Sequence, residues 1–69
     1  MEILFANTLQ SLRKEKKLKQ SELGEKLDMT QRKISYLETG KAEPSLADLW
    51  KISDFFDVSV DFLIGKKPY

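Results

Sequence analysis

The chain has 69 residues, enough for a single domain (1–69) near the lower size limit at which a hydrophobic core is stable unaided. It has no Cys and no His, which excludes disulfides and thiolate metal sites and removes the commonest general base, so we expect neither an enzyme nor a bound cofactor or metal. No stretch approaches the ~20 apolar residues of a membrane span or forms a signal peptide, and the net charge of +1 points by itself to no class of partner.

The first two helices are predicted from the spacing of leucine and phenylalanine. Phe5, Leu9 and Leu12 follow the i, i+4, i+7 pattern of one helical face, which predicts a helix over about residues 6–16. Two further leucines lie one helical turn apart and predict a second helix over about residues 20–27. Each segment has one apolar stripe, so both are expected to pack on a shared core.

A third helix is predicted to follow after a tight turn. Thr30 offers a hydroxyl for the N-cap, and Ile34 and Leu37 form a new apolar pair at i, i+3. Gly40 suits the left-handed backbone position that ends a helix. The third helix is therefore expected over about residues 31–38.

The last two helices are predicted to begin at serine N-caps. Ser45, with Asp48 three residues later, resembles a capping box and predicts a fourth helix. Ser59 predicts a short fifth helix, which Gly65 ends, and residues 66–69 are expected to form a loose tail. The chain is therefore predicted to be all-α with five helices. The expected buried face of the fourth helix consists of Leu46, Leu49, Ile52, Ser53 and Phe56.

Residues 20–38 carry the most informative functional pattern. Two short helices joined by a tight turn form a helix-turn-helix, whose second helix lies in the DNA major groove. Gln31 and Arg32 open that second helix. Amide and guanidinium groups are the ones that pair with adenine and guanine edges, so this arrangement indicates base recognition.

The charge is distributed unevenly along the chain. Residues 1–41 carry nine Lys and Arg against six Asp and Glu, a balance of +3, whereas residues 42–69 carry three against five, a balance of −2. This asymmetry suits a protein that presents one face to a polyanion. The alternative is an ordinary solvated surface, because a charged fraction of 33% is not unusual for a helical domain.

Three segments together resemble the phage repressor and Cro family, the XRE-type transcriptional regulators. They are LKQSELGEKLDMT, ISYLETGKAEPS and FDVSVDFL, at the spacing that this family uses, and the resemblance extends from about Leu9 to Gly65. It implies a lambda-repressor-like domain of five helices, in which the second and third helices read DNA. It also implies symmetric operators bound by dimers.

The resemblance assigns roles to individual side chains. The family's base-reading positions fall on Gln31, Arg32, Ser35 and Tyr36. Its contacts to DNA phosphates fall on Arg13, Gln20, Lys33, Thr39, Gly40 and Lys41. Arg13 and Glu38 also match an ion pair that sets the angle of the recognition helix. From the residues alone, two unrelated surface charges are the alternative for that pair.

Three positions depart from the family pattern. Lys19 stands where Thr or Ser usually caps the second helix, so Ser21 is an alternative cap, one that would place Gln20 outside the helix. Gly24 replaces the usual Ala, which still permits close packing but costs ~1 kcal/mol of helix propensity. Asp28 replaces the usual Gly of the turn, and its tolerance of a left-handed backbone is expected to preserve that turn.

The C-terminal end is expected to carry a dimer contact, because the other helices are committed to DNA or to the core. Val60, Phe62 and Ile64 would form a small apolar patch there, and a core position is the alternative for Phe62. Trp50 and Phe55 flank the fourth helix, where we expect the rim of the core. A surface for a partner protein is the alternative for these two aromatic residues.

The sequence therefore predicts a transcriptional repressor that binds a two-fold symmetric double-stranded DNA operator as a homodimer. We expect it in the cytoplasm, at the nucleoid, with no small-molecule effector. One alternative is an antitoxin that represses its own operon and binds a toxin. The other is a protein-interaction module that has lost DNA binding. Steep salt dependence of DNA affinity would distinguish a DNA-binding protein from such a module.

Overall fold

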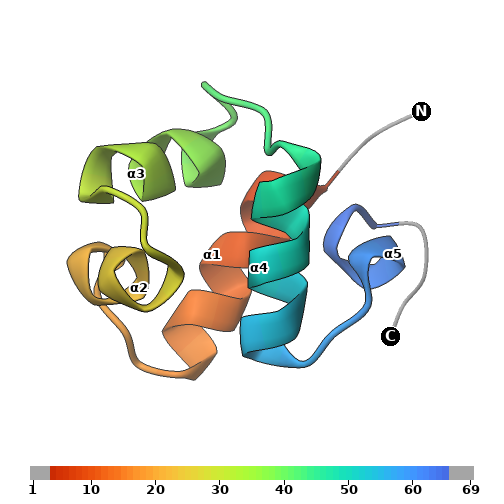
Figure 1. Ribbon diagram of the computed structural model, residues 1–69, viewed down its shortest axis with the longest axis horizontal. Helices are drawn as coiled ribbons and strands as arrows, with labels where there is room; N and C mark the ends of the chain where they lie inside the picture. The colour runs from red at the N-terminus through yellow and green to blue at the C-terminus, as the bar shows by residue number, and fades with distance from the viewer. Residues whose placement is uncertain (1–3, 66–69) are drawn as a thin grey trace.

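The five expected helices are all present in the computed structural model, which describes residues 4–65 (Figure 1). No strand occurs within that range. The first helix begins and ends one residue earlier than predicted, and the third ends one residue later. The predicted tail 66–69 lies outside the described residues. The helices are α1 (Phe5–Glu15), α2 (Gln20–Leu27), α3 (Gln31–Thr39), α4 (Leu46–Phe56) and α5 (Val60–Leu63).

The hydrophobic core draws side chains from all five helices. In Figure 1, α2 and α3 lie together at one end, α5 lies at the other end, and α1 and α4 lie between them. Helix α3, which the sequence predicts to be the recognition helix, packs against both α2 and α1. Its position therefore depends on the two elements that precede it in the chain. The buried cluster consists of Phe5, Leu9, Leu23, Leu27, Ile34, Leu37, Ile52, Phe56 and Leu63.

The predicted N-caps of the last three helices are confirmed. The Thr30 hydroxyl accepts a hydrogen bond from the Lys33 N–H at 3.1 Å, and Ser59 caps α5 in the same manner. Ser45 accepts from the Asp48 N–H at 3.0 Å, while a carboxylate oxygen of Asp48 accepts from the Ser45 N–H at 3.0 Å. This reciprocal arrangement is a capping box with Asp in place of Glu.

The exposed side of α4 differs from the prediction. Leu46 is 87% exposed and Trp50 is 69% exposed, so neither belongs to the buried face or to the rim of the core. Asp48 lies on the buried face instead, one turn before Ile52. Leu46 is the first residue of α4, where the apolar spacing alone could not show which way the side chain faces. The prediction holds for Phe55, which packs against the core.

The turn between α2 and α3 has the left-handed backbone that the sequence suggested. Asp28 ends α2 with a φ of 57°, so Asp adopts the left-handed backbone that was expected of it in this turn. The chain then doubles back onto α2, and the Met29 N–H donates to the Gly24 carbonyl at 2.8 Å. A Cβ atom on Gly24 would lie only 2.5 Å from the Met29 carbonyl oxygen. Gly24 is therefore a place of close backbone approach, not a freely exchangeable helix position.

Replacing Gly24 by Ala is expected to destabilise the domain. Ala favours a helix by about 1 kcal/mol relative to Gly, but the added methyl group meets a backbone carbonyl that cannot rotate away. We expect a net loss of about 1–2 kcal/mol in the free energy of unfolding, measured by urea titration with circular dichroism. The matched control is Glu25→Ala on the exposed face of α2, which is expected to change stability by less than about 0.5 kcal/mol. A stabilised Gly24→Ala variant would show that the turn relaxes freely.

Candidate DNA-binding surface

The predicted base-reading residues lie on the outer side of α3. Gln31 and Arg32, the first two residues of this helix, are exposed, and Tyr36 is 40% exposed. Ser35 is partly buried. Ile34, on the opposite side of the helix, is completely buried. Positions i, i+1, i+4 and i+5 share one helical face, so the first turn of α3 and its neighbours present a continuous polar surface.

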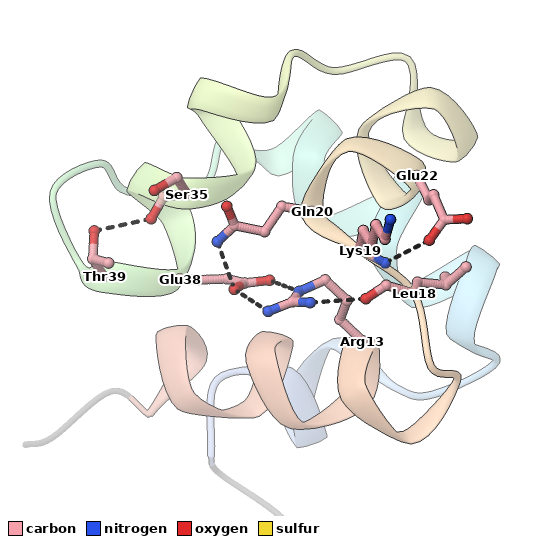
Figure 2. A network of polar contacts seen from close by, with 8 residues as sticks. All are labelled: Arg13, Leu18, Lys19, Gln20, Glu22, Ser35, Glu38 and Thr39. Carbon is pink, nitrogen blue, oxygen red and sulfur yellow. Dashed lines mark hydrogen bonds and ion pairs between the residues drawn. The ribbon is translucent and has the colours of Figure 1, made fainter.

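A buried ion pair anchors the C-terminal end of α3 to α1 (Figure 2). Nε of Arg13 lies 2.6 Å from one carboxylate oxygen of Glu38, and an Nη donates to the other oxygen at 3.0 Å. The remaining Nη donates to the carbonyl of Leu18 at 2.8 Å. The Glu38 side chain is 1% exposed and that of Arg13 is 11% exposed. The ion pair between Arg13 and Glu38 that the resemblance implies is therefore present, and it is buried and bidentate.

Gln20 joins the same network from the start of α2. Its amide nitrogen donates to Glu38 at 3.2 Å, and Figure 2 shows the carboxylate between Gln20 and Arg13. An amide nitrogen has two hydrogens, so Gln20 retains one donor for another acceptor. Each guanidinium nitrogen of Arg13 already donates within the protein, and this side chain is only 11% exposed, so its remaining N–H groups have little access to a phosphate. This geometry suits Gln20 as a phosphate contact and leaves Arg13 with a scaffolding role.

The beginning of α2 is capped without a side-chain acceptor at the N-cap. Lys19 has no acceptor to offer, but its backbone N–H donates to the carboxylate of Glu22 at 2.8 Å. This bond is half of a capping box. The helix consequently starts at Gln20 and not beyond the alternative cap Ser21.

The loop after α3 turns its backbone donors inward. Gly40 has the predicted left-handed conformation with a φ of 79°, and the Lys41 N–H donates to the carbonyl of Tyr36 at 2.9 Å. The Thr39 hydroxyl donates to the Ser35 carbonyl at 2.9 Å (Figure 2). The Lys41 side chain is exposed, with its ammonium 5.7 Å from the centre of the Tyr36 ring. The lysine side chain is thus the group in this loop that is best placed for a phosphate.

A second ion pair, which the sequence did not indicate, holds the other end of α3. Nζ of Lys33 lies 2.9 Å from a carboxylate oxygen of Asp48 on α4. The Asp48 side chain is 8% exposed and that of Lys33 is 43% exposed. Burial by itself raises the pKa of Asp48. The hydrogen bond from the Ser45 backbone and the Lys33 ammonium together lower it by more than burial raises it, so this pKa lies below its ordinary value. The carboxylate is therefore held in its charged form.

The candidate dimer patch lies on α5 and on the residue that follows it, Ile64. Val60 is 37% exposed, and Phe62 and Ile64 are partly exposed, whereas Leu63 between them is completely buried. Phe62 lies outside the buried cluster. The core position considered for Phe62 is therefore filled by Leu63 instead. Within residues 4–65, no helix is long and apolar enough to cross a membrane.

Together these features define a class of protein. An α2–turn–α3 unit with an exposed, polar first turn on its second helix, anchored to the rest of the domain at both ends, is a helix-turn-helix domain of the kind that binds DNA. The model of the Helix-turn-helix family matches residues 9–63, and the chain belongs to this family. The predicted relation to XRE-type regulators is confirmed, and the family consists of DNA-binding transcriptional regulators that are not enzymes.

Two bacterial regulators illustrate the relation in sequence. The chain is 38% identical over 61 residues to an HTH-type transcriptional regulator of Bacillus subtilis, YqaE, and the match covers 88% of this chain and 53% of that protein. It is 42% identical over 61 residues to the HTH-type transcriptional activator BcrR of Enterococcus faecalis, over 88% of this chain and 30% of that protein. The chain thus spans about half, or less, of these two relatives.

A solved structure of the same fold contains DNA. It is the P22 c2 repressor protein in complex with a synthetic operator, with a TM-score of 0.85 and 25% sequence identity. The match covers 91% of this chain and 96% of that one. The predicted fold, an all-α lambda-repressor-like domain, is thereby confirmed.

Proposed function

We propose that this protein represses transcription by binding a two-fold symmetric DNA operator as a homodimer. The observation that carries the proposal is the exposed amide and guanidinium pair at the start of α3, on a helix anchored at its far end by a buried ion pair. The similar P22 c2 protein is a repressor bound to an operator, and the similar BcrR is an activator. Recruitment of polymerase by the bound protein is accordingly the alternative sign of regulation. A regulator of this kind acts where the DNA is, at the nucleoid in the cytoplasm.

The surface suggests a division of labour among the side chains. Gln31 and Arg32 project from the first turn of α3, with Ser35 and Tyr36 one turn later, and we assign these four to base edges. We assign the DNA backbone to Gln20 and Lys41, at the two borders of the motif. The Thr39 hydroxyl and the Gly40 N–H, which are also expected at phosphates, donate to backbone carbonyls of α3 in the free protein. Phosphate contacts set the register of the protein on the duplex, and base contacts provide the specificity.

Gln31 is expected to pair with an adenine through N6 and N7. Gln31→Ala should therefore cost about 1–3 kcal/mol at one base pair of the best site and relax the preference for adenine there. Selection of bound sequences from random DNA identifies the site, and titrations of single-base variants measure the loss. The control is Glu25→Ala on the exposed face of α2, for which we expect an unchanged preference. A Gln31→Ala protein as selective as the parent would remove Gln31 from the base-reading set.

Lys41 is expected to contact a phosphate. Lys41→Met should weaken binding to specific and to non-specific DNA by similar factors, because phosphates carry no sequence information. The slope of log affinity against log salt concentration should fall by about 0.9, the value for one released counterion. An unchanged slope would show that the Lys41 ammonium remains with Tyr36 in the complex.

One observation favours a second candidate function, an antitoxin that binds both its operator and a toxin. Leu46 and Trp50 lie one helical turn apart on α4, and both are strongly exposed. Exposed apolar pairs of this kind occur at protein interfaces. Co-expression with the product of an adjacent gene, followed by co-purification with the parent but not with Trp50→Ser, would support this function. If the parent does not co-purify with that product, the repressor remains the sole proposal. If the Trp50→Ser variant still co-purifies with it, the partner does not bind at the exposed pair on α4.

A further inference from the structure

We propose that Lys33 and Asp48 form a clamp that positions the first turn of the recognition helix for base reading, and that Lys33 is not a phosphate ligand. The inference rests on the proposed DNA binding and extends it to two residues on different helices. Lys33 is among the phosphate contacts that are expected from the sequence. The geometry around Asp48 points to a different role.

Asp48 is a rigid point of attachment. One of its carboxylate oxygens accepts from the Ser45 backbone N–H at 3.0 Å, and the other lies 2.9 Å from Nζ of Lys33. The side chain is 8% exposed and lies on the buried face of α4. Because the same carboxylate closes the capping box of α4, it cannot follow Lys33 outward without loss of that cap. Asp48 is therefore the fixed partner of the pair, and it holds Lys33 against α4.

The clamp is attached where base reading begins. Lys33 is the third residue of α3 and directly follows Gln31 and Arg32. The far end of the same helix is tied to α1 through Glu38 and Arg13. With one end fixed, release of the other allows α3 to pivot, and the largest displacement falls on its first turn. The two ion pairs thus add a polar attachment near each end of a nine-residue helix whose middle is packed in the core through Ile34 and Leu37.

Electrostatics support this role for Lys33. A cation in the first turn of a helix opposes the helix dipole, and α3 has no acidic residue in that turn. Asp48 offsets this unfavourable placement with a buried negative charge. The Lys33 side chain is 43% exposed, but its charge is balanced by a carboxylate at 2.9 Å, so it adds little to the attraction of phosphates. Lys41 is also exposed and, within residues 4–65, forms a ring contact with Tyr36 but no ion pair.

The test compares two lysines of the same region, Lys33 in the first turn of α3 and Lys41 just after that helix. Lys33→Met and Lys41→Met are each titrated with the best selected site and with a random duplex across a series of salt concentrations. For Lys33→Met we expect a loss of about tenfold in specific affinity, the scale of one misplaced base contact, with random-duplex affinity and salt slope near those of the parent. For Lys41→Met we expect equal losses on both DNAs and a slope lower by about 0.9.

Asp48→Asn provides the second arm, because its amide oxygen still accepts the Ser45 N–H while the charge is removed. It should reproduce the specific loss seen in Lys33→Met, and the double variant should be no worse than either single one. Lys33→Arg, which keeps the cation, should restore specific binding. A slope lower by about 0.9 in Lys33→Met, with unaltered specific binding in Asp48→Asn, would make Lys33 a phosphate ligand and overturn the clamp.

A measurement on the protein without DNA tests the Lys33–Asp48 pair independently of the proposed function. A double-mutant cycle of Lys33→Met and Asp48→Asn, measured by urea unfolding without DNA, should show a coupling between the two residues. A parent protein that prefers no DNA sequence would contradict the proposed function, and the cycle would still test the pair. Zero coupling in the cycle would contradict the clamp, whatever the protein binds.

Discussion

Replacing Arg13 by Met is expected to lower the free energy of unfolding by about 3–5 kcal/mol. The variant leaves the carboxylate of Glu38, which is 1% exposed, with only the amide of Gln20 as a partner. It also removes the donor to the Leu18 carbonyl, at the beginning of the α1–α2 connection. A core of this size rarely contributes more than about 3–5 kcal/mol of net stability, so the variant should be largely unfolded at 37 °C. Urea titration at low temperature with circular dichroism measures the loss.

The neighbouring lysine provides a matched control for this charge deletion. Lys14 is an exposed residue of α1, so Lys14→Met should change the stability by less than about 0.5 kcal/mol. The double variant Arg13→Met, Glu38→Met should recover much of the loss, because it leaves no unpaired buried charge. If the two single losses simply add in the double variant, Arg13 and Glu38 do not interact.

Replacing Phe62 by Glu is expected to abolish cooperative binding to a full operator. A single domain reads too few base pairs to find one site among genomic competitors, so two copies must act together. Joint binding of two linked modules raises affinity by about 10²–10⁴-fold, and Phe62→Glu should lose that gain while half-site affinity stays unchanged. The partly exposed patch on α5 is small, so the free parent should be largely monomeric and should dimerise on the operator.

A variant of the neighbouring residue Leu63 distinguishes an effect on folding from an effect on dimer assembly. Leu63 is completely buried, so Leu63→Glu should unfold the domain and serve as the reference for a core position. Phe62→Glu should instead retain the circular dichroism spectrum and half-site affinity of the parent. If Phe62→Glu unfolds like Leu63→Glu, Phe62 is a core residue. If it folds and still binds a full operator cooperatively, the dimer uses another face.

The helix order and the limits of each helix followed from the sequence because their signals are local. A cap is formed by a side chain and a backbone N–H three residues later, as in Thr30 with Lys33 and Ser45 with Asp48. Apolar residues one turn apart likewise report on their own helix, as Leu23 and Leu27 do. These contacts lie within a few residues of one another, so their geometry is set by the helix itself. The helices accordingly agree with the predictions to within one residue at the ends that were predicted.

The base-reading side of α3 was also predictable, although only with help from the resemblance. Ile34 and Leu37 identify the buried side of the helix, and Gln31 and Arg32 must then lie toward the outside. The pairing of Arg13 with Glu38 spans 25 residues, and no spacing rule connects them. It was implied by the family pattern alone.

Contacts between helices required the tertiary structure. Lys33 and Asp48 are 15 residues apart, and each already had a local explanation, as a basic residue near DNA and as a capping residue. Whether two such side chains meet depends on the rotation and the crossing of α3 and α4, which the packing of both helices on the shared core decides. The same packing turns Leu46 and Trp50 outward and brings the Met29 carbonyl against Gly24. Sequence periodicity describes one helix at a time, whereas these contacts depend on how two elements lie against each other.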